Sequence, residues 1–311
     1  MHTPVLLEQV LEYLAPRGGS ELMVDATMGE GGHSHAFLDR YPDLSIVGID
    51  ADSDIQAVAM ERLAGFSGRV EFYRGRAQDF FASYPAGGKR PNTVLADLGI
   101  SLFHYEKSGR GFSFSGDEPL DMRIDTSVGV SAAELLAGMS EKEIADMLYR
   151  NAEERYSRRI ARAIVQARQC GAIVSTAALA ELVKQAVPVS YRYGHINPAT
   201  RTFLALRIAV NGELARLPDL LEDALRVLEP GGRLGIISFH SLEDRVVKNI
   251  FKKKSLDCTC PPEVPFCRCT GRTVRVLTRK GIAPDEAEIK RNPPSRSARL
   301  RVVEKIKDAD A

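Results

Sequence analysis

The segment from Leu22 to Asp50 constrains the fold more than any other part of the sequence. It predicts a strand over Leu22–Asp25, a glycine turn, a helix from about Ser34, and a second strand that ends at Asp50. A turn of small residues lets the backbone approach a ligand, and the following helix offers unpaired N–H groups. Asp50 follows Gly32 by 18 residues, where nucleotide-binding α/β folds place the acid that binds ribose hydroxyls.

The residues of this turn indicate which class of nucleotide it suits. A dinucleotide-binding turn has the pattern G-x-G-x-x-G, whereas here Gly29 and Gly31 are followed by Ser34 at the third position. Asp25 and Glu30 flank the turn, and their negative charges would repel a pyrophosphate. They suit a cationic ligand such as S-adenosylmethionine, with its ammonium and sulfonium groups. The alternative is an ordinary glycine-rich turn that binds nothing.

The composition excludes some classes of protein. A chain of 311 residues with 44% hydrophobic residues has room for one large or two ordinary domains. Its net charge is only +1, but residues 245–301 hold fifteen Lys and Arg against five Asp and Glu. No apolar run approaches the ~20 residues that a membrane span needs. The amphipathic start carries acids, which fits neither a signal nor a transit peptide, and the cysteine count is odd. We therefore expect a cytoplasmic protein with no membrane partner.

Strands and helices alternate through the first hundred residues, which predicts a parallel, doubly wound sheet. Helices are expected over 3–14 and 54–64, and further strands over 70–73, 93–97, 232–238, 273–278 and 298–303, seven strands in all. The alternation stops between the fourth and fifth strands. There an irregular stretch over 110–123 precedes helical segments over 131–139, 141–168 and 176–186. Roughly residues 106–207 therefore read as a helical domain inserted between two strands. Helices over 217–228 and 245–254, the second capped by 241–244, flank the fifth strand.

Seven ordered blocks spread over nearly the whole chain resemble a known family, the bacterial small-subunit ribosomal RNA methyltransferase H or MraW family. The blocks are HTPVLLEQV, DATMGEGGHS, DLGIS, RGFSFSGDEPLDMRID, NPATRTFLALRIAVN, LEPGGRLGIISFHSLEDRVVK and RNPPSRSARLR. Several of them are longer than ten residues, so a chance match is not a reasonable explanation.

The resemblance implies a fold, a reaction and a partner. The fold is a Rossmann-like class I methyltransferase of the α/β class with an inserted all-helical domain. It is divided into residues 1–105, the inserted substrate-recognition domain 106–207, and residues 208–311. The reaction transfers a methyl group from S-adenosylmethionine to the exocyclic N4 amino group of a cytosine in the decoding region of 16S ribosomal RNA. The expected partner is this RNA, within the small ribosomal subunit.

The family's cofactor site maps onto seven positions of this chain. They are Gly31, Gly32, His33, Asp50, Ala77, Asp97 and His104. Two of these depart from the family pattern, because Ala77 stands where an aromatic residue is usual and His104 where the family has glutamine. Histidine and glutamine both donate and accept hydrogen bonds, so the second contact can persist. His33 either orients the cofactor or simply begins a helix.

Asp97 is the expected catalytic residue, because it ends the fourth strand where class I folds bring cofactor and acceptor together. The amine of cytosine is a poor nucleophile, and a carboxylate aimed at the developing positive charge helps the transfer. Asp97 is expected to face the cofactor, the target amine or both. The alternative is that it only caps the next helix.

The residues expected to bind RNA lie in the insertion and after the fifth strand. They are Arg110, Phe112, Phe114, Arg123, Arg201 and His240. The two phenylalanines are expected to stack on an extruded base, and the alternative is that they plug a junction between domains. Arg201 is expected on a phosphate, and His240 either lines the target pocket or has a structural role. Arginines of the insertion, from Arg155 to Arg162, form a basic face that is either a wall of an RNA cleft or merely solvated.

Four of the five cysteines fall within twelve residues, at Cys258, Cys260, Cys267 and Cys269. Four thiolates satisfy tetrahedral zinc, but C-x-C pairs are tighter than the common C-x-x-C spacing. We therefore expect reduced thiols in a basic surface loop and no metal, with zinc as the less favoured alternative.

The residues that bind the cofactor do not identify the molecule that accepts the methyl group, so three other functions remain as alternatives. A methyltransferase that acts on DNA or protein is the main alternative. A nicotinamide oxidoreductase is disfavoured by the missing glycine and by the acids at the turn. A non-catalytic RNA-binding module is disfavoured by the intact turn and by Asp50.

Overall fold

The structure is a computed structural model that describes residues 3–194, 196–258, 260, 266–267, 269 and 271–309. The chain divides into two compact units. Unit 1 comprises Met1–Ile100 and Arg216–Ala311, and unit 2 comprises Ser101–Ala215. Unit 2 contains the predicted insertion, residues 106–207, and extends beyond it at both ends.

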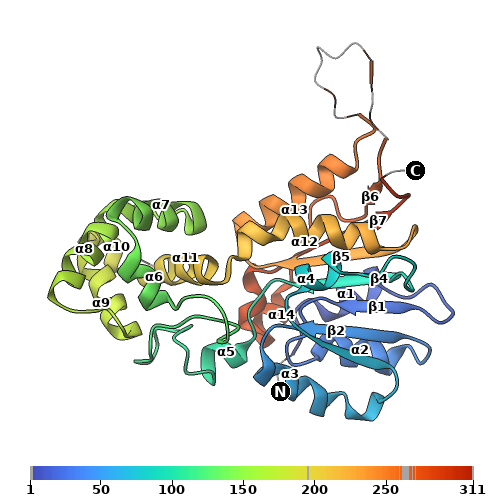
Figure 1. Ribbon diagram of the computed structural model, residues 1–311, viewed down its shortest axis with the longest axis horizontal. Coiled ribbons are helices and arrows are strands. Elements are labelled where there is room, and N and C mark those ends of the chain that lie inside the picture. The colour runs from blue at the N-terminus through green and yellow to red at the C-terminus, as the bar shows by residue number, and fades with distance from the viewer. Residues whose placement is uncertain are drawn as a thin grey trace. The chain divides into compact units, whose positions relative to one another are not determined.

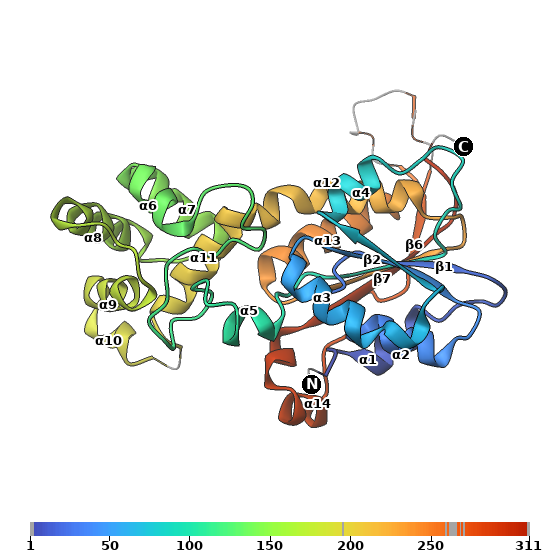
Figure 2. The same cartoon turned by 60° about the horizontal axis from the view of Figure 1, so that its bottom comes forward.

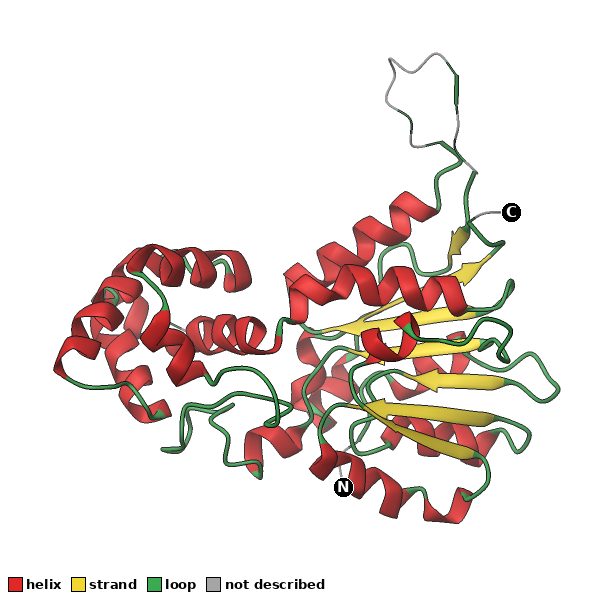
Figure 3. Cartoon of the chain, viewed as in Figure 1, coloured by secondary structure: helices red, strands yellow, loops and turns green. Residues whose placement is uncertain are grey.

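A seven-stranded sheet forms the centre of unit 1 (Figures 1 and 3). The strands are β1 (Leu22–Asp25), β2 (Ser45–Asp50), β3 (Val70–Arg74), β4 (Thr93–Asp97), β5 (Arg233–Ser238), β6 (Val274–Val276) and β7 (Arg299–Lys305). Their order in the sheet is β3-β2-β1-β4-β5-β7-β6. All seven predicted strands are confirmed. The parallel arrangement predicted from the first hundred residues is confirmed for β1 to β4, and β5 is also parallel to β4. β7, in contrast, runs antiparallel to both β5 and β6.

Helices cover both faces of this sheet, as the doubly wound prediction requires (Figure 2). Neighbouring residues of a strand point to opposite faces, so Val24 belongs to one apolar core and Met23 to the other. The first core packs against α4 (Ala77–Ala82), α12 (Glu213–Val227) and α13 (Ser241–Lys254). The second packs against α1 (Leu7–Tyr13), α2 (Gly32–Arg40) and α3 (Ser53–Arg62).

The N-terminal helix starts later than the sequence predicts. We expected a helix from residue 3, but α1 begins at Leu7, because Leu6 takes a left-handed conformation with φ 54°. The amide of Leu6 donates to the Glu288 carboxylate at 2.7 Å. Glu288 lies in α14 (Glu286–Arg291), so the start of unit 1 is tied to its last helix. Two short 3₁₀ turns, η1 (Ala64–Phe66) and η2 (Pro293–Ser297), complete unit 1.

Unit 2 is helical. Its helices are α5 (Leu102–Glu106), α6 (Ala132–Gly138), α7 (Glu141–Ala152), α8 (Ser157–Cys170), α9 (Thr176–Ala186), α10 (Val189–Arg192) and α11 (Ala199–Asn211). α11 packs against α6, α7 and α9. The predicted single helix over 141–168 is wrong, because Glu153 is left-handed with φ 50° and separates α7 from α8. Glu154 is fully buried in this break and accepts a hydrogen bond from the Tyr191 hydroxyl at 3.0 Å.

The irregular stretch of unit 2 is held by hydrogen bonds rather than by regular structure. The amide of Met122 donates to the Arg110 carbonyl at 2.7 Å, which closes the stretch into a loop. The Asn211 side-chain amide donates to the Met122 carbonyl at 2.8 Å and so attaches the loop to α11. Residues 107–131 are therefore an ordered loop, in agreement with the prediction for 110–123.

No helix among the described residues is both long enough and apolar enough to cross a membrane.

Candidate cofactor and methyl-transfer site

Three adjacent parallel strands of unit 1 end in a carboxylate at the same edge of the sheet. They are β1 at Asp25, β2 at Asp50 and β4 at Asp97. In open α/β sheets, ligands bind outside the carboxyl ends of the strands. The sequence predicts this convergence, and it provides the geometric basis of the candidate site.

The turn that follows β1 is fastened to both neighbouring strands. The Thr27 hydroxyl accepts a hydrogen bond from the amide of Asp97 at 2.6 Å. On the other side, the amide of Gly29 donates to Oδ2 of Asp50 at 2.9 Å. A second amide, that of Asp52, donates to Oδ1 of Asp50 at 2.9 Å. The turn therefore sets the orientation of the Asp50 carboxylate directly and holds the backbone of Asp97 in place.

Asp25 lies beneath the turn and faces the first turn of α2. It is 2% exposed, and its Oδ2 accepts a hydrogen bond from the Ser34 hydroxyl at 2.6 Å. The pKa of Asp25 is raised to about 6, mainly by burial and to a smaller extent by the charge of Asp50. Hydrogen bonds from the Ser34 side chain and the Thr27 backbone act in the opposite direction and lower it. Asp25 therefore contributes negative charge to the site from inside the protein.

Asp97 has the more strongly perturbed carboxyl. The pKa of Asp97 is raised to about 7, mainly by burial and to a smaller extent by the charges of Asp25 and Glu243. The amide hydrogen bond from Gly99 acts in the opposite direction and lowers it. The Gly99 amide lies 3.1 Å from Oδ1 of Asp97. A carboxylate that is disfavoured by burial and by like charges is stabilised by a cation placed beside it. The site is thus suited to a cationic ligand.

Glu243 is a member of this cluster that the sequence analysis did not single out. It lies in the first turn of α13, is 1% exposed, and accepts a hydrogen bond from the amide of Phe239 at 2.8 Å. We expected residues 241–244 to cap the helix, but the cap residue is His240, whose Nδ1 accepts from the Glu243 amide at 3.4 Å. The spacing His240-x-x-Glu243 was the available signal, because Glu three residues after a cap is a capping box.

The remaining predicted cofactor residues of unit 1 lie at helix starts. Gly31 caps α2 with φ 73°, a left-handed conformation that suits glycine. A Cβ on Gly32 would lie 2.7 Å from Cγ of Pro4, so this glycine permits close packing of the N-terminal segment. His33 is the second residue of α2, and its Nε2 lies 3.0 Å from the Val5 carbonyl, while its contact with the cofactor stays a prediction. Ala77 is the buried first residue of α4.

His104, the last predicted cofactor residue, lies in unit 2. It is in α5, is 4% exposed, and its ring packs edge to face against Phe112 at 5.2 Å between centroids. Phe112 is itself 5% exposed, so it packs within the protein in this structure, while its stacking on a base stays a prediction. Phe114 is half-buried and contacts Phe203 of α11, with 5.0 Å between the ring centroids.

The predicted RNA-binding arginines of unit 2 have partners within that unit. Arg123 forms a two-pronged ion pair with Asp121, with hydrogen bonds of 2.8 and 2.7 Å. Arg110 donates to the Ile124 carbonyl at 2.9 Å, and Arg201 donates to the Glu153 carbonyl at 2.7 Å. These contacts show what the three side chains do in the free protein, while their contacts with RNA stay predictions.

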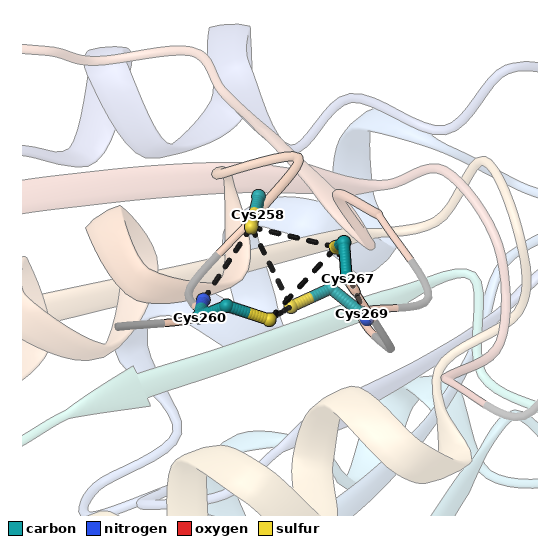
Figure 4. A group of neighbouring side chains, drawn as sticks. All are labelled: Cys258, Cys260, Cys267 and Cys269. Atoms are coloured by element: carbon teal, nitrogen blue, oxygen red, sulfur yellow. Dashed lines mark hydrogen bonds between the residues drawn. The ribbon is translucent and has the colours of Figure 1, made fainter. Parts of the chain in front are cut away.

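The four clustered cysteines converge in the segment between α13 and β6 (Figure 4). Their sulfur atoms all lie within 4.8 Å of one another. None of these four described cysteines forms a disulfide, and neither does Cys170 at the end of α8.

Comparisons with known proteins agree over nearly the whole chain. Residues 1–306 match the MraW methylase family. A protein of Treponema denticola named ribosomal RNA small subunit methyltransferase H is 55% identical over 307 residues, which cover 98% of each chain. The protein of the same name from Syntrophobacter fumaroxidans is 47% identical and covers 98% of this chain and 96% of its own. Among solved structures, a putative methyltransferase from Streptococcus mutans in complex with SAH aligns at 12% identity with a TM-score of 0.43, covering 98% of this chain and 100% of that one.

The raised pKa of Asp97 predicts how the stability of the ligand-free protein depends on pH. The folded protein favours the protonated carboxyl, so this contribution to stability is complete below the unfolded pKa of 3.8 and is lost as the pH rises through about 7. Asp97→Asn removes the charge. Each pKa unit corresponds to about 1.4 kcal/mol of free energy. The free energy of unfolding of the variant, relative to that of the wild type, should therefore be more than about 1 kcal/mol higher at pH 8 than at pH 5.

Thermal unfolding of both proteins at the two pH values measures this gain. Asp43→Asn, at an exposed carboxylate in the turn before β2, is the matched control and should show no such gain. Equal effects of Asp97→Asn at both pH values would show that Asp97 is not under electrostatic strain.

Proposed function

Because the chain belongs to the MraW methylase family, we propose that it methylates the exocyclic N4 amino group of a cytosine in the decoding region of 16S ribosomal RNA. It is an S-adenosylmethionine-dependent methyltransferase of ribosomal RNA, as its family and its curated relatives indicate. The observation that supports the transfer site is the set of carboxylates at the ends of β1, β2 and β4. Because the proposed substrate is part of the small ribosomal subunit, the proposed site of action is the cytoplasm.

The carboxylate cluster fits the cofactor that the family implies. S-adenosylmethionine supplies an electrophilic methyl group on a sulfonium and carries a second positive charge on its ammonium. Asp50 is oriented by two backbone amides, and a carboxylate at this position is the group that accepts ribose hydroxyls in nucleotide-binding α/β folds. Burial disfavours the charged forms of Asp25 and Asp97 and so raises their pKa values, and a bound cation would stabilise those charged forms.

We assign the transfer step to Asp97. The cytosine amine has its lone pair delocalised into the ring, so the enzyme must hold it in line and stabilise the positive charge that develops on nitrogen. A fixed carboxylate does this without reorganisation at the moment of reaction. Its pKa of about 7 also suits a group that accepts a proton near neutral pH. His240 and Glu243 lie after the neighbouring strand β5 and are proposed to shape the pocket for the base.

We propose that unit 2 recognises the RNA. Its α8 carries Arg158, Arg159 and Arg162 on an exposed face, while Arg155 lies over the rings of Tyr156 and Tyr191. Exposed arginines at helical spacing suit contacts with phosphates, and such contacts give affinity without reading sequence. The loop over residues 107–131, with Phe114 and Arg110, is the proposed part that meets the target base. The second candidate function, methylation of DNA or protein, has no comparable support from the relatives.

Mass mapping of small-subunit RNA from cells with and without this protein tests the proposed function. We expect one cytosine of the decoding region to carry a methyl group on N4 and to lose it when the protein is absent. Purified protein should restore the methyl group on small subunits or on naked 16S RNA, but not on DNA of the same sequence. An unchanged RNA, or a methyl group on another base, would overturn the proposal.

A pair of variants separates cofactor binding from transfer. Asp50→Ala removes a charged hydrogen-bond acceptor worth about 1.5–3 kcal/mol, so it should weaken S-adenosylmethionine binding about tenfold to a hundredfold. Asp97→Asn keeps the shape and a carbonyl but loses the charge, so it should lower the single-turnover rate by about 10²–10³ even with saturating cofactor.

Calorimetry measures binding, and single-turnover methylation measures the rate. Saturating cofactor should rescue Asp50→Ala and leave Asp97→Asn slow. Full rescue of Asp97→Asn would make Asp97 a binding residue without a role in transfer.

A further inference from the structure

The loop between α13 and β6 is long and is closed at its base. α13 ends at Lys254, and the amide of Thr273 donates to the Lys254 carbonyl at 2.9 Å. Arg272 and Asp257, one on each side of the loop, approach to 3.5 Å in an exposed ion pair. A loop of this length loses considerable conformational entropy when it adopts one structure, so it needs internal cross-links or a packed core.

The described part of this loop has no apolar packing to hold it. Cys258 and Cys267 are exposed, and Cys260 and Cys269 are only half-buried. Phe266, the residue before Cys267, is 81% exposed, so its ring does not pack into a core. Hydrophobic burial therefore does not explain why four thiols meet here.

The sulfur positions match those of ligands around a single ion. Sγ of Cys258 lies 3.4 Å from Sγ of Cys267, and Sγ of Cys260 lies 3.4 Å from Sγ of Cys269. The cross pairs, Cys260 with Cys267 and Cys258 with Cys269, are 3.9 and 4.0 Å apart. Zn–S bonds of about 2.3 Å in a tetrahedron place the sulfurs about 3.8 Å apart. A disulfide requires about 2.05 Å, so the sulfurs are too far apart for one.

The backbone supports the same arrangement. The amide of Cys260 donates to Sγ of Cys258, and the amide of Cys269 donates to Sγ of Cys267, both at 3.4 Å. In each C-x-C pair, the amide of the second cysteine thus donates to the sulfur of the first. Hydrogen bonds from amides to sulfur stabilise thiolates and orient them toward a metal. In Figure 4 the four side chains point toward one another from the two arms of the loop.

We propose that Cys258, Cys260, Cys267 and Cys269 bind one structural Zn²⁺ ion, which closes this loop. The interpretation of these cysteines as unliganded thiols, which the C-x-C spacing favoured, gives way to the observed convergence of the sulfurs. Four protein ligands leave no open position for a substrate or water, so the ion has no part in methyl transfer. The four thiolates and the ion carry a net charge of −2, which suits the basic end of α13 at Lys252 and Lys253.

A single ion also fits better than an iron–sulfur cluster. In a cluster the cysteines bind different irons that are bridged by sulfide, which spreads their sulfurs beyond the spacing seen here. A tetrahedral set of four sulfurs accommodates zinc or a single iron, and zinc is the ion that structural Cys₄ sites in proteins hold. Metal analysis distinguishes these ions directly.

The test is metal analysis of the full-length protein, purified under reducing conditions from zinc-replete cells. We expect about one zinc per chain in the wild type. Cys258→Ser/Cys267→Ser removes one ligand from each C-x-C pair and should lose nearly all of the zinc. Cys170→Ser is the matched control, since Cys170 is an exposed free cysteine of unit 2, and it should keep the full amount.

A second measurement keeps the proposal testable if the double variant folds poorly. The wild-type protein, stripped with a chelator and kept reduced, is titrated with Co²⁺. A tetrahedral set of thiolates should give intense visible absorption that saturates at about one equivalent and disappears when zinc is added. A metal-free wild type that binds neither ion, a protein that holds iron instead, or full zinc in the double variant would each overturn the proposal.

Discussion

Burial of several carboxyl groups at one edge of the sheet is the constraint on which the site of unit 1 depends. Asp25 and Asp97 sit at the ends of adjacent strands, with Asp50 on the other side of Asp25 and Glu243 near Asp97. A protein pays in stability for such an arrangement, and groups of this kind cluster at functional sites. The surrounding hydrogen bonds hold the acids in place despite the cost of burying their charges, and a cationic ligand would offset that cost.

The fold determines the position of each of these acids. Parallel strands deliver their last residues to one edge, and the turn after β1 bonds to β2 and β4 on either side. Helices on both faces bury the inner strands β1, β4 and β5 along most of their length, and the three aspartates lie where β1, β2 and β4 end. The site is therefore formed by the ends of three neighbouring strands and by one turn, and most of its residues lie in short continuous stretches of the sequence.

That locality explains what the sequence predicted well. The strand ends at Asp25, Asp50 and Asp97 follow from hydrophobic runs that stop at an acid, and all three were confirmed as strand ends. What the sequence did not predict depends on contacts between distant segments or on single dihedral angles. Glu243 affects the site because it is buried and its charge acts on Asp97. The break between α7 and α8 depends on the left-handed backbone of a single residue, Glu153. The antiparallel direction of β7 depends on its pairing with β5, which lies more than sixty residues earlier in the chain. The convergence of the cysteines is likewise a matter of how a loop folds back, which spacing alone did not reveal.

The central claim is that the carboxylate of Asp97 is stabilised by a cationic cofactor, and the pH dependence of cofactor affinity tests it most directly. Calorimetry of S-adenosylmethionine binding to the wild type and to Asp97→Asn at pH 6 and pH 8 suffices, because the ligand's own titration is common to both proteins. With a pKa of about 7 in the free protein, Asp97 is mostly protonated at pH 6 and mostly ionised at pH 8. From pH 8 to pH 6 the affinity of the wild type should therefore fall about tenfold more than that of the variant, and at pH 6 the wild type should release a proton on binding. The same pH dependence in both proteins, with no proton release specific to the wild type, would contradict the account.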